Sequence, residues 1–188
     1  MEEKLYTLSV FTENFIGLLH RVTTVFTKRK LNIESIAASQ SEVEGIHRYT
    51  ISLKTTKDLA EAIVMQLERQ VDVLRAFIHE EEDTVFQEIA LYKVPTDALH
   101  MGDEVENIIR EHNARILTFT PEFVVVEKTG HPEDTQELFR RFEPYGLLEF
   151  VRSGRIAITK PMKNITHYLK EAEENFSHKK NGKNKEQQ

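Results

Sequence analysis

The sequence predicts an α+β protein of two successive units that share one order of elements, namely strand, helix, strand, strand, helix and strand, followed by a polar tail. Two patterns alternate along the chain. Runs in which apolar and polar residues alternate are typical of half-buried strands, and stretches with apolar residues three and four positions apart are typical of amphipathic helices. Because these elements occur twice in the same order, we expect two ferredoxin-like βαββαβ units, each with four antiparallel strands and both helices on one face.

The first predicted unit covers residues 1–79 and begins with a strand and a helix. Over residues 4–12 the apolar positions Tyr6, Leu8 and Val10 alternate with polar ones, which predicts a strand. The period then changes to that of a helix over residues 17–30, whose apolar face would consist of Leu18, Leu19, Val22, Val25 and Phe26.

The rest of this unit is predicted to be a hairpin, a second helix and a fourth strand. Alternating residues predict the hairpin strands over 32–39 and 46–53, and the short apolar run 73–78 predicts the last strand. Asp58 is a suitable N-cap for the intervening helix, whose apolar residues are Leu59, Ile63, Leu67 and Val71.

An acidic run at residues 79–83 marks the boundary between the units, because such a run is normally a solvated connection. The second unit is predicted over residues 84–160. Its expected elements are strands over 85–94, 115–120, 123–128 and 147–151, a helix over 103–112, a turn at Pro121, a helix beginning at Pro132, and an extra hairpin through Ser153 and Gly154 whose return strand carries Ile156 and Ile158.

The tail, residues 161–188, is rich in lysine, glutamate and asparagine. Such a composition cannot bury enough apolar surface to fold alone, so we expect a charged, flexible extension. A short helix is predicted over residues 164–176 at its start.

Composition argues against several classes of function. The net charge of −6 and the lack of a compact basic face before the tail argue against nucleic acid and anionic membranes as partners. With no cysteines, disulfides, thiolate metal sites and cysteine nucleophiles are excluded. The 8 histidines lack metal-site spacing, and no Walker, nucleophile-elbow or dinucleotide-binding motif occurs. The acidic N-terminus and the lack of a run of about 20 apolar residues predict a cytoplasmic protein outside the membrane.

Two residues at the first strand–helix junction, Asn14 and Gly17, predict a binding loop. A helix start carries unpaired N–H groups and partial positive charge, which attract a carboxylate or phosphate without a basic side chain. Gly17 would let such a group approach the backbone closely, and Asn14 can donate and accept hydrogen bonds. The alternative is that Asn14 only caps the helix and Gly17 eases a turn.

Four ordered motifs resemble one family, the regulatory or small subunit of acetolactate synthase, also called acetohydroxyacid synthase. The resemblance covers residues 5–160. Its motifs are Glu13-Asn14-x-x-Gly17-Leu18-Leu19-x-Arg21 with Arg29-Lys30-Leu31-Asn32-Ile33-Glu34-Ser35-Ile36, then Leu67-x-x-x-Val71-Asp72-Val73-Leu74-Arg75, Thr120-Pro121 and Val151-Arg152-Ser153-Gly154. The resemblance implies that the first unit is an ACT-type amino-acid-binding domain.

The resemblance also implies partners and an absence of catalysis. Members of this family have no catalytic centre of their own. They bind and activate a large subunit that carries thiamine diphosphate, magnesium and FAD, and they confer feedback inhibition by a branched-chain amino acid, usually valine, in the synthesis of valine, leucine and isoleucine. We therefore expect no cofactor, metal or catalytic residue on this chain.

The same resemblance places the effector site at the interface of a homodimer. One wall would be the first loop of one copy, with Asn14, Phe15, Ile16, Gly17 and Leu18, and the other would be Asn32 and Ile33 from the second copy. Phe15 and Ile16 are bulkier and more apolar than the pair expected there. Lys30 stands where the family often has a glycine that ends the first helix.

Two alternatives of other classes stay open at this stage. The chain could be a stand-alone amino-acid sensor or an ACT-type regulator of another enzyme, and an enzyme built from scattered residues is not excluded by any motif. A single-stranded RNA binder of the same element order is disfavoured, because the strand over 46–53 offers only Tyr49 as an aromatic platform.

Overall fold

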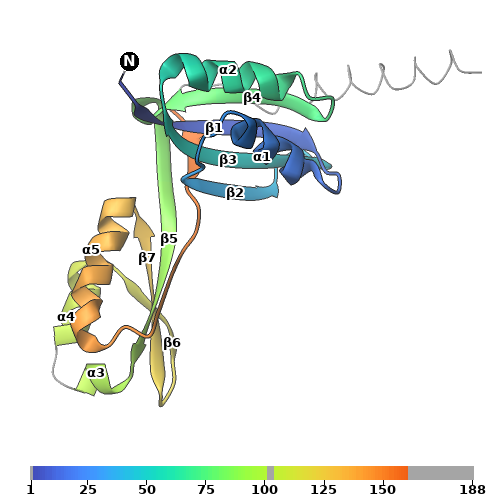
Figure 1. Ribbon diagram of the computed structural model, residues 1–188. Helices are drawn as coiled ribbons and strands as arrows, with labels where there is room; N and C mark the ends of the chain where they lie inside the picture. The colour runs from blue at the N-terminus through green and yellow to red at the C-terminus, as the bar shows by residue number, and fades with distance from the viewer. Residues whose placement is uncertain (1, 101–103, 161–188) are drawn as a thin grey trace, which may run out of the picture. The chain divides into compact units, whose positions relative to one another are not determined.

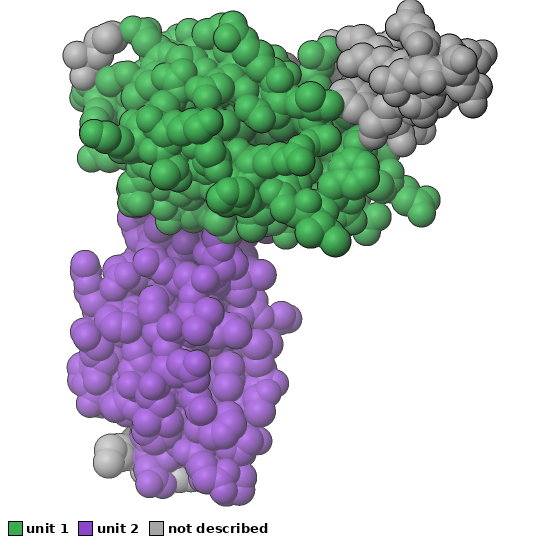
Figure 2. Space-filling model, turned by 45° about the vertical axis from the view of Figure 1, so that its right-hand side comes forward, with its two compact units in different colours: residues 1–85, 157–188 green, residues 86–156 purple. Residues whose placement is uncertain are grey.

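The structure of the chain, a computed structural model, describes residues 2–100 and 104–160. The described residues form two compact units, one of residues 2–85 with 157–160 and one of residues 86–156 (Figure 2). The first unit therefore takes in a segment that follows the second unit in sequence. The two peptide bonds that connect the units lie within strands, at Val85–Phe86 and Ile156–Ala157.

The first unit is a four-stranded antiparallel sheet in the order β2-β3-β1-β4, with α1 and α2 on one face (Figure 1). This confirms the predicted α+β class and the split β-α-β arrangement. The elements are β1 Lys4–Glu13, α1 Leu18–Lys28, β2 Ser35–Gln40, β3 Ile46–Thr55, α2 Lys57–Glu68 and β4 Val73–Glu80.

The core of this unit forms where the helix-facing residues of the strands meet the apolar faces of the helices. Its fully buried members include Leu8 and Val10 of β1, Ile51 of β3 and Ile63 of α2. A second, smaller cluster lies around Phe11, with Val43, Ile46, Leu74 and the partly buried Phe77. Near its end, β1 buries apolar side chains on both faces of the sheet, because the adjacent residues Val10 and Phe11 are both fully buried.

The second unit repeats the sheet-and-helix arrangement, with strand order β6-β7-β5-β8 and β9 paired to β5 off that path. Helices α4 and α5 supply Val105, Ile108, Leu138 and Phe142 to its core, which Tyr92 of β5 joins. The elements are β5 Thr84–Pro95, α3 Asp97–His100, α4 Glu104–Glu111, β6 Arg115–Phe119, β7 Phe123–Gly130, α5 Pro132–Phe142, β8 Glu149–Arg152 and β9 Ile156–Thr159, with 3-10 turns at Glu81–Asp83 and Glu143–Tyr145.

The extra hairpin predicted through Ser153 and Gly154 is wrong. Strands β8 and β9 do not pair with each other, and both pair with β5. β5 has twelve residues, and β8 pairs only with its residues Ala90 to Lys93. The chain therefore continues along β5 after β8 and pairs with it again as β9. The Ser153 and Gly154 segment is therefore an interruption in one edge rather than a turn, and its Ser153 N–H donates to the Ile89 carbonyl at 2.8 Å.

The start of α2 has a different N-cap from the predicted one, and the end of α1 keeps the backbone geometry that a glycine would give. Thr56, not Asp58, is the N-cap of α2, and Asp58 lies in the first turn, where a negative charge favours the helix dipole. At the end of α1, Lys30 adopts the left-handed conformation, with φ 55°, that a glycine would take. Its N–H donates to the Thr27 carbonyl and that of Leu31 to Phe26, which is a Schellman motif.

Other boundaries shift by a few residues. β2 begins at Ser35 rather than at residue 32, most of the acidic run forms the 3-10 turn Glu81–Asp83, and α3 was not predicted. Pro132 does start α5, where its missing N–H costs nothing. The predicted tail and its short helix over residues 164–176 lie outside the described residues.

Candidate functional site

The loop between β1 and α1 leaves a helix start open. Gly17 is the N-cap residue of α1 and takes φ 85°, with no side chain bonded at the cap. Asn14 is therefore not the cap of this helix. The N–H of Leu18 donates to the Phe15 carbonyl at 3.3 Å, whereas among the described residues the N–H groups of Gly17 and Leu19 donate no hydrogen bond. These unpaired donors suit an anion.

Three contacts brace this loop against neighbouring turns. The Asn14 N–H donates to the Gly45 carbonyl, in the β2–β3 turn, at 3.0 Å, and the Glu13 N–H donates to the Asp72 carbonyl at 3.2 Å. The Arg21 guanidinium forms an ion pair with the Asp72 carboxylate. The loop is thus held at both ends before any ligand binds, which lowers the ordering entropy that binding would cost.

Exposure separates the loop residues into two kinds. Asn14, Phe15 and Ile16 are exposed, Ile16 completely so. Leu18 is only 2% exposed, so its side chain belongs to the interior of the unit and only its backbone faces the loop. Of the predicted wall, the surface therefore offers an amide, two large apolar side chains and the open backbone at Gly17.

The second predicted wall lies elsewhere in the same copy. Asn32 is exposed and Ile33 is partly buried against the first core cluster, and both precede β2. β2 begins with Ser35 opposite Ser52 of β3, whereas the loop follows Glu13, which is opposite Ile46. These two positions are six residues apart along β3, or about 20 Å. A single copy does not bring the two walls together.

The β2 edge of the first sheet has the composition of a pairing surface. Its sequence, Ser-Ile-Ala-Ala-Ser-Gln, contains no charged residue and no proline, and it stands at the end of the strand order. Natural edge strands that stay unpaired are usually protected by charge, proline or a bulge. The opposite edge, β4, carries Arg75, His79 and Glu80. Of the two edges, β2 is the one suited to pair with another strand.

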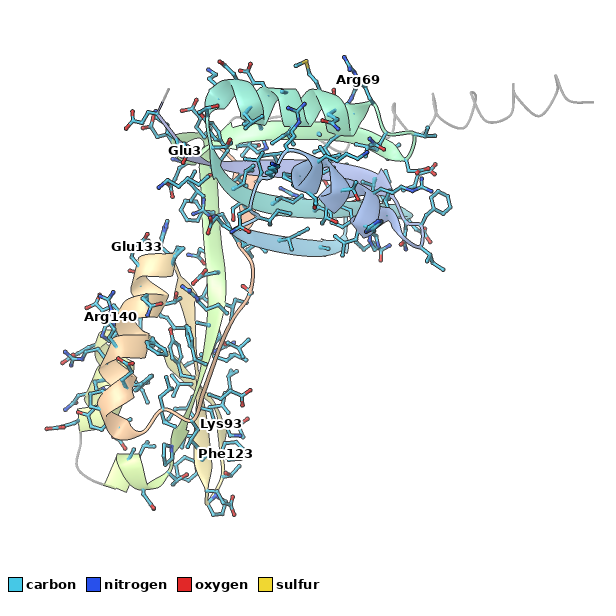
Figure 3. The ribbon with its side chains drawn as sticks, in the orientation of Figure 1. Glu3, Arg69, Lys93, Phe123, Glu133 and Arg140 are labelled. Carbon is cyan, nitrogen blue, oxygen red and sulfur yellow. The ribbon has the colours of Figure 1, made fainter. Side chains whose placement is uncertain are left out.

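The second unit presents an apolar surface on the open face of its sheet. Leu91 of β5 and Val151 of β8 are exposed there, and Lys93 lies over the Phe123 ring, 4.4 Å from its centroid (Figure 3). The Lys93 ammonium is 3.9 Å from the Glu149 carboxylate. A shallow hollow of about 270 Å³ has as its lining Leu91, Lys93, Phe123, Val125, Glu149 and Val151. Exposed apolar patches of this kind mark protein contacts.

Residues 2–100 and 104–160 contain no group of three or more histidine, aspartate or glutamate side chains placed to hold a metal ion. None of the helices in these residues is long and apolar enough to cross a membrane. In the second unit the buried Glu88 accepts from the Thr135 hydroxyl and lies 3.4 Å from the exposed Arg152. These contacts tie α5 to the sheet.

A βαββαβ unit with an open helix start and an uncharged edge strand is of the class suited to bind a small anionic ligand and to pair with a second copy. Comparison with known families is more specific: residues 8–75 match the "AHAS small subunit-like ACT domain" and residues 87–161 the "small subunit of acetolactate synthase". The chain belongs to the small-subunit family of acetolactate synthase, as a regulatory, non-catalytic component of that enzyme of branched-chain amino acid biosynthesis.

Two relatives support this membership, and a solved structure shares the fold. The acetolactate synthase small subunit of Mycolicibacterium smegmatis is 34% identical over 162 residues, covering 85% of this chain and 94% of the relative. That of Bacillus subtilis is 32% identical over 160 residues, covering 84% of this chain and 91% of the relative. The crystal structure of the Thermotoga maritima small subunit shares the fold, with a TM-score of 0.78 at 24% identity, covering 85% of this chain and 99% of that one.

Sequence reasoning missed one residue of the site. Gly45, at φ 81°, turns the chain so that its carbonyl meets Asn14. A glycine after Glu44 between two predicted strands signals a turn, but contact with a loop 30 positions earlier depends on strand register. Arg21 and Asp72 were present in the family motifs, and the structure brings them together as an ion pair.

Proposed function

We propose that this subunit binds a branched-chain amino acid, with valine the first to test, between two copies of its first unit, and that it activates the large subunit and makes it subject to feedback inhibition. The observation that carries the proposal is the strand register. Asn14 and Gly17 follow one end of the sheet and Asn32 precedes the other, about 20 Å away, so both walls can form one site only with a second copy.

An antiparallel pairing of two β2 strands would supply that second copy. Such a pairing sets the start of β2 in one copy beside the end of β2 in the other, and it joins the two sheets into one of eight strands. Asn32 and Ile33 of one copy would then lie near the β1–α1 loop of the other copy. The hydrogen bond from Asn14 to Gly45 supports this, because it bends the loop toward the β2–β3 turn.

The chemistry of the two walls fits an amino acid. The open N–H groups at Gly17 and Leu19 would hold the carboxylate, Asn14 and Asn32 the polar backbone atoms, and Ile33, Phe15 and Ile16 the aliphatic side chain. Burying a valine side chain contributes about 1.5 to 3 kcal/mol, so recognition of the charge must supply much of the affinity. The bulk of Phe15 and Ile16 would favour a small aliphatic side chain over a large one.

Regulation would then follow from a shift in populations. A ligand that binds only between two copies stabilises their pairing, and this pairing would hold the large subunit in its less active state. The exposed apolar surface of the second unit supports a protein partner. Thiamine diphosphate, magnesium and FAD would belong to the large subunit, with both subunits in the cytoplasm and neither nucleic acid nor membrane involved.

A stand-alone amino-acid sensor is the second candidate, and the loop alone would suit it equally well. The match of residues 87–161 to the small-subunit family favours an acetolactate synthase partner instead. Co-purification with that large subunit, followed by activity assays with and without valine, separates the two. A chain that binds valine but neither binds nor stimulates the large subunit would be a stand-alone sensor.

The decisive variant is Gly17→Asp, compared with Gly17→Asn. A side chain at Gly17 meets open space, and both residues share the strain of a positive φ, so the pair differs mainly in charge. Aspartate would set a carboxylate where the effector's must lie. We expect calorimetric valine affinity to fall at least tenfold for Gly17→Asp and less than threefold for Gly17→Asn. Equal binding of valine by both variants would contradict the proposal that the effector's carboxylate lies at Gly17.

A further inference from the structure

One charged side chain of the first unit, that of Arg48, is partly buried at a distance from the β1–α1 loop. Arg48 is in β3, on the sheet face opposite the helices, directly between Phe11 of β1 and Ser39 of β2. The side chain is partly buried, its Nε is fully enclosed, and among the described residues that atom has no hydrogen-bond partner. Burial lowers the pKa of this guanidinium, although it stays charged. Because withdrawing a charge from water is costly unless it is hydrogen-bonded, the contacts of this guanidinium matter for the structure around it.

The Arg48 guanidinium joins the sheet to the chain that returns from the second unit. Its Nη2 donates to the carbonyl of Ala157 at 2.6 Å and to the Ser9 hydroxyl at 3.3 Å. Its central carbon also lies 5.5 Å from the centroid of the Phe11 ring. One nitrogen thus serves both acceptors while the planar, weakly hydrated guanidinium lies against the Phe11 ring, a packing that the more strongly hydrated lysine ammonium reproduces only in part.

The returning segment, residues 157–160, has a second anchor. The Lys160 N–H donates to the Asp83 carbonyl at 2.9 Å, and its ammonium donates to the Glu82 carbonyl at 2.7 Å. This anchor is made to the 3-10 turn before β5, whereas Arg48 attaches the segment to the sheet itself. Because Ala157 follows Ile156 directly, Arg48 holds the first residue that the chain contributes after leaving the second unit.

Arg48 is also connected to both parts of the proposed effector site. Phe11 is completely buried and lies three residues before Asn14, at the point where the β1–β4 register shifts. It meets the Phe77 ring edge to face, with centroids 6.2 Å apart, so its position is fixed by packing on both sides. On its other side Arg48 is opposite Ser39, in the β2 edge proposed to pair with a second copy.

We propose that Arg48 is a positioning residue for feedback: through Phe11 and Ser39 it senses the pairing of the first unit, and through the Ala157 carbonyl it passes that state to the second unit. The proposal rests on the proposed function. Arg48 touches neither the loop nor the effector. A change in strand position at Phe11 or Ser39 would move the guanidinium relative to the Ala157 carbonyl and the Ser9 hydroxyl, because its Nη2 donates to both.

The test uses the full-length subunit reconstituted with its large subunit, with valine as the probe and leucine and isoleucine as further arms. Arg48→Met keeps an unbranched side chain over Phe11 but removes every donor, and Arg48→Lys keeps the charge. Arg75→Met is the matched control, because Arg75 is opposite Phe11 from the β4 side and is exposed. Lys160→Met is a second control, because it loosens the other anchor of the same segment.

For Arg48→Met we expect valine affinity by calorimetry within threefold of the wild type, while maximal inhibition at saturating valine falls by at least half. Arg48→Lys should restore part of that inhibition. Lys160→Met should lower the melting temperature but leave maximal inhibition unchanged, as should Arg75→Met. Full inhibition of Arg48→Met enzyme, or an equal loss in Lys160→Met enzyme, would overturn the proposal. If the wild-type subunit binds none of the three amino acids, the proposed function fails instead.

Discussion

The backbone N–H of Asn14 donates a hydrogen bond to the carbonyl oxygen of Gly45 at 3.0 Å. This bond links two turns that are far apart in sequence but adjoin at one end of the first sheet, because β1 and β3 are antiparallel and Thr12 is opposite His47. The proposed effector loop therefore has a fixed position relative to the hairpin whose outer strand is β2. Changes that loosen the loop should weaken binding without touching the ligand.

Asp72→Asn is the first such change. Asp72 holds the loop twice, through its carbonyl to the Glu13 N–H and through its carboxylate to Arg21. The substitution removes only the ion pair, and since Arg21 is well exposed we expect a loss of stability of about 0 to 1 kcal/mol. Valine affinity, measured by calorimetry, should fall by about two- to fivefold. Glu61→Gln, on the exposed side of α2, is the control and should leave affinity unchanged.

Ala38→Lys tests the pairing of two copies. Ala38 is an exposed residue in the uncharged β2 edge, and a two-fold pairing of β2 strands would place two such lysines in the same short interface. We expect the dimer dissociation constant, measured by sedimentation, to rise at least tenfold, with valine affinity falling in parallel. Met65→Lys adds the same charge to the exposed face of α2 and should do neither. An unchanged dimer in Ala38→Lys would place the interface elsewhere.

The order of elements could be read from sequence because periods of two and of three to four are local properties. The spacing of Leu18, Val22 and Val25 suffices to define α1, and all three are buried. Register is not local. Nothing in the sequence near Asn32 tells that β2 begins about 20 Å along β3 from the end of β1, which follows only from the pairing of Ser35 with Ser52 and of Glu13 with Ile46.

The wrong hairpin has the same cause. Ser153 and Gly154 carry turn signals, which led to the prediction of a hairpin. Whether the chain then reverses or resumes depends on how much of the neighbouring strand is still unpaired. β5 is long enough to accept β9 after β8, and its length is set by residues some sixty positions earlier.

Lys30→Gly should stabilise the protein. Lys30 is exposed and takes φ 55°, a left-handed conformation that costs a residue with a Cβ about 1 to 2 kcal/mol. Glycine avoids that cost but loses more chain entropy on folding, so we expect a net gain of about 0.5 to 1 kcal/mol in urea unfolding. Asn113, at φ 49°, ends α4 with the same pair of hydrogen bonds. Since asparagine tolerates this conformation, Asn113→Gly should gain less, and an equal or larger gain there would contradict the argument.

Tyr92→Phe should change how stability depends on pH. The Tyr92 hydroxyl is buried in the second core and donates to the Thr135 carbonyl at 2.6 Å. Burial raises the pKa of this phenol well above its ordinary value near 10. Because the folded pKa is the higher one, the neutral phenol contributes stability that is fully present below about pH 10 and is lost as the pH rises toward the folded value.

At pH 7 the phenylalanine variant should therefore be less stable by about 0.5 to 1.5 kcal/mol, the net contribution of one hydrogen bond. Above pH 10 the wild type should lose stability faster than the variant, because only the wild type must keep this phenol protonated to stay folded. The gap between the two urea unfolding curves should then narrow between pH 10 and pH 11. The other tyrosines are common to both proteins and cancel in the difference, so a gap that stays constant across this range would show that Tyr92 ionises alike in the folded and unfolded chains.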